Sequence, residues 1–183
     1  MRPGGGGAKG AAFERDICRR LSMWWSGDKD RDDIFWRSSQ SGGRATERAK
    51  KGKRTFGSYG DIAAVDPLGL PLLKFFTFEL KRGRTHGSLG DLMDMSKDAA
   101  WQPFEKCMQQ AALSAQQAKS ITWMLIVQRD RRHCMAYADT ATWKTLGIRT
   151  PHRVRTRLGS IGAIKFSTFL GQLNPETIRR RIH

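Results

Sequence analysis

The stretch KFFTFELKRG, residues 74–83, combines the composition of a buried strand with two opposite charges near its end. Its aromatic and β-branched residues are typical of a strand packed in a core, and we predict a strand over residues 72–81. Side chains alternate along a strand, so Glu79 and Lys81 share one face while Leu80 points to the other. The pair fits two interpretations: an exposed ion pair, worth about 0–1 kcal/mol, or a metal ligand beside a catalytic lysine.

The composition favours a single folded domain with a polyanionic partner. The 183 residues are enough for one domain with a real core. The formal charge is +16, from 33 Lys and Arg against 17 Asp and Glu. An excess of this size destabilises a compact state by self-repulsion and is typical of proteins that bind polyanions. Nucleic acid is favoured over an anionic membrane, because we find no long amphipathic helix with separate basic and apolar faces.

Simple features of the sequence argue against membrane insertion, secretion and a cysteine framework. No stretch approaches the roughly 20 uncharged apolar residues that span a bilayer. The N-terminal MRPGGGGAKG has no apolar segment of the kind found in secretory signals. The cysteines Cys18, Cys107 and Cys134 are widely spaced, which argues against disulfides or a zinc site. These features predict a protein of a reducing cytoplasm.

Hydrophobic periodicity predicts an α/β domain with a mixed central β-sheet flanked by helices, in the order αβββαβ. We expect helices at residues 10–25, 103–118 and 140–146, and strands at 34–37, 61–65, 72–81, 121–127, 133–137 and 163–169. The turn signal DPLG between the second and third strands predicts that they form a hairpin. Residues 1–8 are expected to be a flexible lead, and residues 38–61 a polar and basic loop.

The predicted hairpin would bring two carboxylates together. Asp61 begins one of its strands and Glu79 ends the other, so the two side chains could share one cation. Mg²⁺ prefers hard oxygen ligands and leaves several positions to water and substrate phosphates. Lys81, on the same face as Glu79, would place an ammonium group beside that site, where it could orient a water molecule or offset charge on a phosphate. Glu-x-Lys alone is a weak signal, and the upstream Asp61 and the high positive charge strengthen it.

Asp61…Glu79-Leu80-Lys81 resembles the PD-(D/E)XK nuclease motif. The chain is most similar to the Holliday-junction resolvases of archaea and their viral relatives over roughly residues 9–128. In those proteins a Lys-Gly precedes a helix that bears Glu-Arg, matched here by Lys9-Gly10 and Glu14-Arg15. A Ser-Gly loop follows their first strand, matched here by Ser41-Gly42-Gly43.

The chain departs from this family pattern in three places. Gly60 stands where the motif has proline. The basic loop between Ser41 and Asp61 is longer than the pattern leads us to expect, which leaves the choice of serine open. Residues 130–183 have no counterpart that we can place.

The resemblance implies a restriction-endonuclease-like core over residues 9–130, with residues 131–183 as a basic extension of the same domain. It implies that Asp61, Glu79 and the backbone carbonyl of Leu80 bind Mg²⁺, for which Mn²⁺ would substitute, and that Lys81 is catalytic. It also implies that Glu14 approaches the metal through water and that Ser41 contacts the scissile phosphate. The remaining expected DNA contacts are basic or hydroxyl side chains near the site: Lys9, Ser39, Arg44, Lys50, Lys51, Lys53, Arg54, Arg82 and Arg84.

These observations predict a Mg²⁺-dependent DNA endonuclease, acting as a homodimer on branched or duplex DNA. Resolution of Holliday junctions in DNA recombination or repair is the first expectation, because recognition by shape suits basic surfaces that need not read bases. Two alternatives stay open: a nuclease of linear duplex or single-stranded DNA in phage replication, repair or restriction, and a non-catalytic DNA-binding protein on the nuclease fold. The presence of Asp61, Glu79 and Lys81 together argues against the second.

Overall fold

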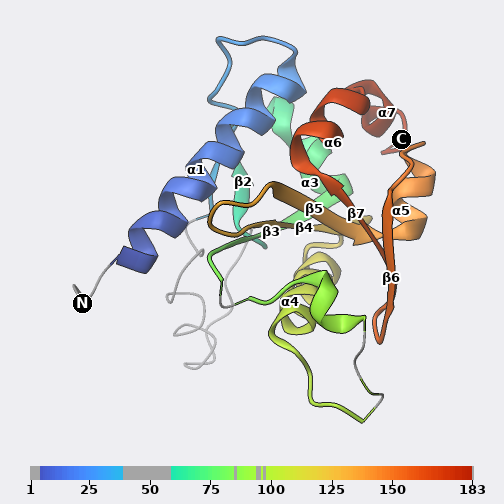
Figure 1. The fold of residues 1–183 in the computed structure, drawn as a ribbon. Helices are drawn as coiled ribbons and strands as arrows, with labels where there is room; N and C mark the ends of the chain where they lie inside the picture. Colours follow the sequence, from blue (N-terminus) through green and yellow to red (C-terminus); the bar gives the residue numbers. More distant parts are fainter. Residues whose placement is uncertain (1–4, 39–58, 85, 94–95, 97, 183) are drawn as a thin grey trace.

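A five-stranded mixed β-sheet lies between helices in the computed structural model, which describes residues 5–38, 59–84, 86–93, 96 and 98–182 (Figure 1). The strands are β1 (Phe35–Arg37), β2 (Ile62–Ala64), β3 (Phe76–Arg82), β4 (Thr122–Gln128), β5 (Cys134–Asp139), β6 (His152–Thr156) and β7 (Gly159–Lys165). The α-helices are α1 (Gly5–Ser26), α3 (Leu70–Phe75), α4 (Pro103–Ala118), α5 (Thr140–Thr145), α6 (Phe166–Gln172) and α7 (Pro175–Arg179). Two 3₁₀ turns, η1 (Pro67–Gly69) and η2 (Leu89–Leu92), complete the described elements.

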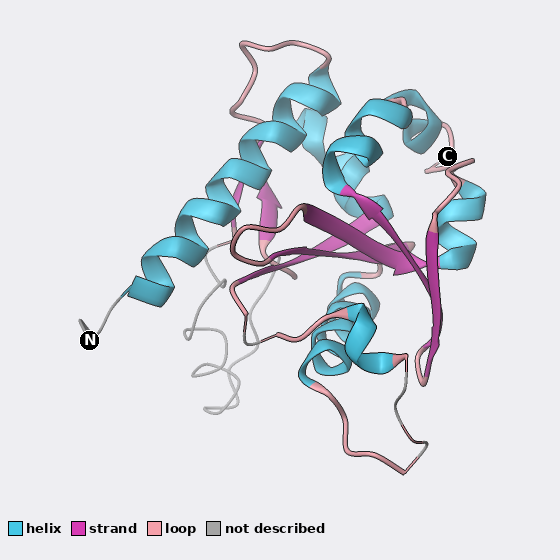
Figure 2. Cartoon of the chain, viewed as in Figure 1, coloured by secondary structure: helices cyan, strands magenta, loops and turns pink. Residues whose placement is uncertain are grey.

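The strand order in the large sheet is β3-β4-β5-β7-β6, and the short strands β1 and β2 form a separate antiparallel pair (Figure 2). Strands β3 and β4 are parallel and are connected through α4, whereas the other neighbours are antiparallel. This arrangement confirms the predicted α/β fold with a mixed sheet flanked by helices.

The two faces of the sheet carry separate parts of the core. Phe76, Phe78 and Leu80 of β3 face a cluster that includes side chains of α1, α3 and α6. The other face packs against α4 through Phe104, Met108 and Ala111, together with alternate residues of β4 and β7. Glu79 and Lys81 therefore lie on the α4 side of the sheet, at the strand that forms one of its edges.

Several predicted elements are confirmed. The expected helix over residues 103–118 coincides with α4, and the strand expected at 121–127 matches β4 to within one residue. Pro103 occupies the first turn of α4, where a backbone N–H would have no partner within the helix, so its absence in proline costs nothing. Strand β4 is buried on both faces, as its continuous apolar run predicts. Helix α1 begins at Gly5, five residues before the expected start, so part of the predicted lead is helical.

The predicted hairpin of strands 61–65 and 72–81 is wrong. Residues 70–75 form the helix α3, and β2 pairs with β1 instead of β3. Pro71 lies in the first turn of α3, and Leu72 and Phe75 are buried from one face of it. The aromatic run that predicts a strand from residue 72 therefore covers a helical turn followed by a strand, and burial alone does not distinguish the two.

The strand expected at residues 163–169 is also partly wrong. Strand β7 ends at Lys165 and α6 begins at Phe166. Phe166 and Phe169, three residues apart, are both fully buried, which is the spacing of a helical face. Among the described residues no helix is both long and apolar enough to cross a bilayer.

Candidate active site

Asp61 lies at the free edge of β3, although no hairpin brings it there. Its backbone N–H donates to the Phe78 carbonyl at 2.8 Å, and its Oδ2 accepts a hydrogen bond from the Leu80 N–H at 2.7 Å. These two bonds flank Glu79. The N–H and C=O of one strand residue point to the same side, so the Leu80 carbonyl also faces this edge. Asp61, Glu79 and the Leu80 carbonyl are thus brought together.

Gly60 permits this close approach. Its φ is +75°, a left-handed conformation, and a Cβ atom at this position would lie 2.4 Å from the Phe78 carbonyl oxygen. Proline fixes φ near −65° and could not adopt this backbone. The departure from the family motif at this position is therefore explained by the local geometry, because only glycine has both the conformation and the space.

Glu79 and Lys81 share one face, as strand alternation predicts. Lys81 Nζ donates to Glu79 Oε1 at 2.6 Å and also contacts Gln110 Oε1 of α4 at 3.3 Å. The Glu79 side chain is 2% exposed. The interpretation as an exposed ion pair at a strand end is therefore wrong, because an exposed pair would leave this carboxylate in water.

Two carboxylates of like charge meet at the site, the buried Glu79 and the partly buried Asp61. Burial and, after it, the negative charge of Glu79 raise the pKa of Asp61 from its ordinary 3.8 to about 7, although the Leu80 N–H and Lys81 lower it. Burial also raises the pKa of Glu79, which Lys81 partly opposes. Burial would lower the pKa of Lys81, but the charge of Glu79 and its hydrogen bond outweigh burial and raise it. Lys81 is therefore an ammonium ion at neutral pH.

Glu14 reaches the site from α1. Its Oε2 accepts a hydrogen bond from Arg37 Nε of β1 at 2.5 Å. Its negative charge also raises the pKa values of Asp61 and Glu79, although burial is the larger cause for both. One helical turn along, burial and the Glu14 carboxylate raise the pKa of the Cys18 thiol to about 12. Glu14 thus contributes charge to the site while it is anchored by Arg37.

The donor set suits a hard divalent cation. Among the described residues, no group of three or more His, Cys, Asp and Glu side chains is placed to hold a metal ion. The charge of the buried Glu79 nevertheless raises the pKa of the partly buried Asp61, and Lys81 opposes this only in part. A divalent ion would relieve the repulsion between the two carboxylates. Mg²⁺ is commonly bound by one or two carboxylates, with water and phosphate oxygens completing its shell. The residues present fit that pattern.

The other predicted site residues fall into two groups. Lys9 and Arg84 are exposed, whereas Arg82 forms an ion pair with Asp130 at 2.8 Å and donates to the Gln128 carbonyl. Arg82 is thus already engaged by the protein. The rest of the predicted set lies outside the described residues: Ser39, Ser41, Arg44, Lys50, Lys51, Lys53 and Arg54.

Sequence reasoning missed three residues that contribute to this region. Gln110 contacts Lys81, Arg37 binds Glu14, and the N–H of the buried Ser38 donates to the Asp61 carbonyl at 2.9 Å. Gln110 belongs to a group of glutamines on α4, and such a composition is more typical of a solvated helix face. No spacing in the sequence links Gln110 to β3. The contact arises because α4, which connects the parallel strands β3 and β4, packs back onto the sheet. Arg37 ends β1 and Ser38 follows it, and the pairing of this segment with the β2 segment would have been the signal.

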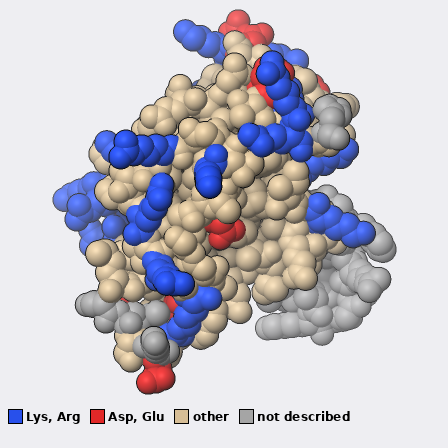
Figure 3. Space-filling model, turned by 90° about the vertical axis from the view of Figure 1, so that its right-hand side faces the viewer, with Lys and Arg blue, Asp and Glu red and all other residues tan. Residues whose placement is uncertain are grey.

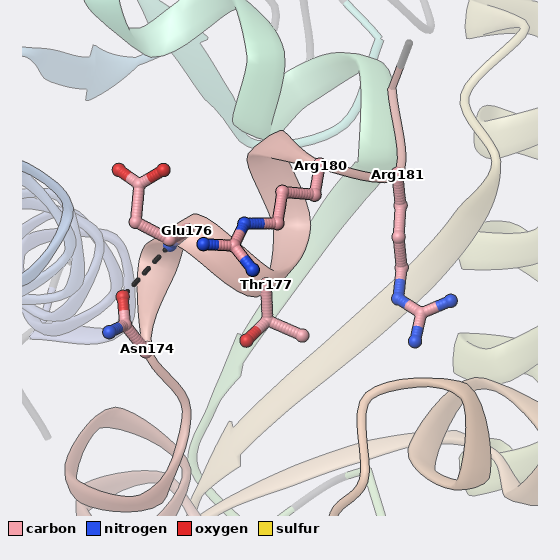
Figure 4. Close-up of a pocket in the computed structure, with 5 residues that line it drawn as sticks. All are labelled: Asn174, Glu176, Thr177, Arg180 and Arg181. Atoms are coloured by element: carbon pink, nitrogen blue, oxygen red, sulfur yellow. Dashed lines mark hydrogen bonds between the residues drawn. The ribbon is translucent and has the colours of Figure 1, made fainter.

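A hollow elsewhere on the molecule does not involve these residues. Asn174, Glu176, Thr177, Arg180 and Arg181 line a space of about 410 Å³ at α7 (Figure 4). Asn174 caps α7 by accepting a hydrogen bond from the Glu176 N–H at 2.9 Å. This hollow lies on the C-terminal extension and is separate from the carboxylates of β2 and β3.

Comparison with known proteins identifies the family of the chain. A family model described as "Phage putative PDDEXK endonuclease" matches residues 6–158. That range contains α1, the Asp61 segment, β3 and α4, the elements that build the candidate site. No curated protein and no solved structure matches the chain. Because the match covers most of the sequence, the chain belongs to this family of phage PDDEXK endonucleases.

Proposed function

We propose that this protein is a divalent-cation-dependent endonuclease that hydrolyses phosphodiester bonds in DNA. The observation that carries the proposal is the convergence at one strand edge of a carboxylate from the β2 segment with the Glu79–Lys81 pair of β3. The Asp61 Oδ2 bond to the Leu80 N–H, at 2.7 Å, fixes this arrangement.

Each residue has a defined part in this function. Asp61, Glu79 and the Leu80 carbonyl would hold Mg²⁺, or Mn²⁺ in its place. Such an ion, when bound, polarises a scissile phosphate and lowers the pKa of an attacking water. Lys81, which the Glu79 charge keeps protonated, offsets negative charge on the phosphate rather than accepting a proton. Glu14, held by Arg37, adds negative charge that favours cation binding.

The finer features of the substrate follow from the family resemblance. A four-way junction is the first candidate, with a homodimer placing two sites on two strands and Ser41 contacting the scissile phosphate. Linear duplex or single-stranded DNA, cut during phage replication, repair or restriction, is the alternative within the same chemistry.

The proposal is tested with three labelled substrates: a four-way junction, a linear duplex and single-stranded DNA, each with Mg²⁺, with Mn²⁺ and with chelator. We expect cation-dependent cleavage of at least one substrate. Asp61→Ala, Glu79→Ala and Lys81→Gln should each lower the rate by at least about 100-fold, because each removes a charge from the reacting centre.

Asp32→Ala is the matched control, because Asp32 is an exposed carboxylate on the loop before β1, and its rate should equal that of the wild type. Wild-type rates in the Asp61→Ala and Glu79→Ala variants would refute the site assignment. Binding of DNA without cleavage of any substrate would instead establish a non-catalytic DNA-binding protein on the nuclease fold.

A further inference from the structure

More than half of the net positive charge of the chain lies in residues 131–183. Residues 131–183 contain eleven Lys and Arg against two Asp and Glu, a net charge of +9 out of the total of +16. The face seen in Figure 3, which is the right-hand side of Figure 1, carries many Lys and Arg side chains and few carboxylates. In Figure 1 this side is formed by β6, α5 and the C-terminal segment. A charge of this density needs an explanation of its own.

Four exposed side chains of α5, β6 and the segment between them make up what we call the β6 surface: Lys144, Arg149, Arg153 and Arg155. Arg153 and Arg155 alternate with Val154 on β6, so both project from the same face of the strand. Arg153 Nε donates to Thr150 Oγ1 at 3.3 Å, which places it beside the segment that bears Arg149. Among the described residues, no Asp or Glu forms an ion pair with any of the four.

The β6 surface is well separated from the cleavage chemistry. Strand β6 pairs only with β7 and forms the edge of the sheet opposite β3. Four strand spacings of about 4.8 Å separate the two edges, a distance of roughly 19 Å. Duplex DNA rises about 3.4 Å per base pair, so this distance corresponds to about six base pairs. Contacts at β6 therefore lie beyond the phosphates that flank the scissile bond.

We propose that the β6 surface is a second DNA-binding surface, which contacts backbone phosphates of a segment at least about six base pairs from the cut. The inference rests on the proposed function, because DNA is favoured over other polyanions by the endonuclease family of the chain. Its arginines suit phosphate oxygens, which they bind through forked N–H donors. The surface enlarges the footprint of the enzyme and favours long or branched DNA over short duplexes.

The test compares two fourfold charge neutralisations with equal net charge. The first variant is Lys144→Gln, Arg149→Gln, Arg153→Gln and Arg155→Gln. The matched control is Arg19→Gln, Lys29→Gln, Lys74→Gln and Lys119→Gln, which removes exposed charges from other parts of the molecule. Binding is measured in chelator, against salt concentration, for a 40-bp duplex and an 8-bp duplex that extends about 14 Å from its centre.

We expect the β6 variant to bind the 40-bp duplex at least tenfold more weakly at 0.1 M salt. The slope of log affinity against log salt should become less negative by roughly 3–4, about one for each lost phosphate contact. Its affinity for the 8-bp duplex should equal that of the control, and the control should keep most of the wild-type slope.

Equal losses in both variants, or wild-type binding by the β6 variant, would overturn the proposal. So would DNA binding that is unchanged while binding to phosphatidylserine vesicles is lost, which would assign the surface to a membrane. Dimerisation of the β6 variant with unchanged DNA binding would show that the charges only protect a sheet edge. These binding results do not depend on cleavage, so failure of this inference and failure of the nuclease activity are distinguishable.

Discussion

Asp61, Glu79 and Lys81 lie together at the edge of one strand, β3. Glu79 and Lys81 lie on the same face of the sheet because side chains alternate along any strand. Asp61 joins them through two hydrogen bonds to the backbone of β3, one from its own N–H and one to its carboxylate, that no local pattern predicts. The result is a pair of carboxylates with raised pKa values, one buried and one partly buried, and this pair gives the first residue-scale prediction.

Asp61→Asn should stabilise the cation-free protein at alkaline pH. The pKa of Asp61 is raised from 3.8 to about 7, so the folded protein holds this proton more tightly than the unfolded chain does. The resulting stability is fully present below about pH 4 and is lost as the pH rises through 7. In chelator at pH 8 we expect the variant to be about 2–4 kcal/mol more stable, with the difference vanishing toward pH 4. Thermal melts across this pH range measure it.

Two controls belong to that measurement. Asp66→Asn should lose stability at pH 8, because the Leu68 N–H and Arg31 lower the pKa of Asp66. Added Mg²⁺ should raise the melting temperature of the wild type and leave that of Asp61→Asn nearly unchanged. Identical melts of Asp61→Asn and the wild type at pH 8 in chelator would show that Asp61 carries no buried charge.

Among the elements, the docking of the β2 segment on β3 depends on Gly60. Gly60→Ala should destabilise the protein by at least about 2 kcal/mol and abolish cleavage, because its Cβ would meet the Phe78 carbonyl at 2.4 Å and Thr77 Cγ2 at 2.8 Å. Asp61 would be pushed away from the strand edge. Chemical denaturation and the cleavage assay measure the two effects.

Gly27→Ala is a control for backbone strain. Gly27 has the same φ of +75°, yet no atom lies within 4 Å of the position that its Cβ would take. Its substitution should carry only the left-handed strain of about 1–2 kcal/mol and leave cleavage intact. Equal effects of the two substitutions would show that the close contact with β3 is unimportant.

In the whole molecule, residues 131–183 complete the sheet and cover its core. They supply β5, β6 and β7, three of the five strands, and bury Trp143, Phe166 and Phe169 against the face of β3 and β4. Burial of one large apolar side chain is worth about 2–5 kcal/mol, and a domain has only about 5–15 kcal/mol in total. The nuclease motif therefore depends on a segment of which the family model matches only residues 131–158.

A chain that ends at Asp130 should not fold. We expect it to lack a cooperative thermal transition by circular dichroism, because β4 would lose its neighbour β5 and its Met124 and Ile126 would lose the aromatic side chains of α5 and α6 from their core cluster. A chain that lacks only Ile182 and His183 should melt within a few degrees of the full protein. Cooperative melting of residues 1–130 would show that the nuclease core is an independent unit.

The local sequence was sufficient for several features. Helix α4, strand β4 and the shared face of Glu79 and Lys81 follow from patterns within a few residues of one another. The superfamily follows from Glu79-Leu80-Lys81 together with Asp61, 18 residues before Glu79. The pairing of β2 with β1, the position of Asp61 on β3 and the contact of Gln110 with Lys81 do not follow from such patterns. Each of these joins segments that are distant along the chain, and many pairings would satisfy the same local preferences. Burial of both sheet faces selects among them, because only the complete fold places α3, α4 and the C-terminal strands where each apolar face is covered.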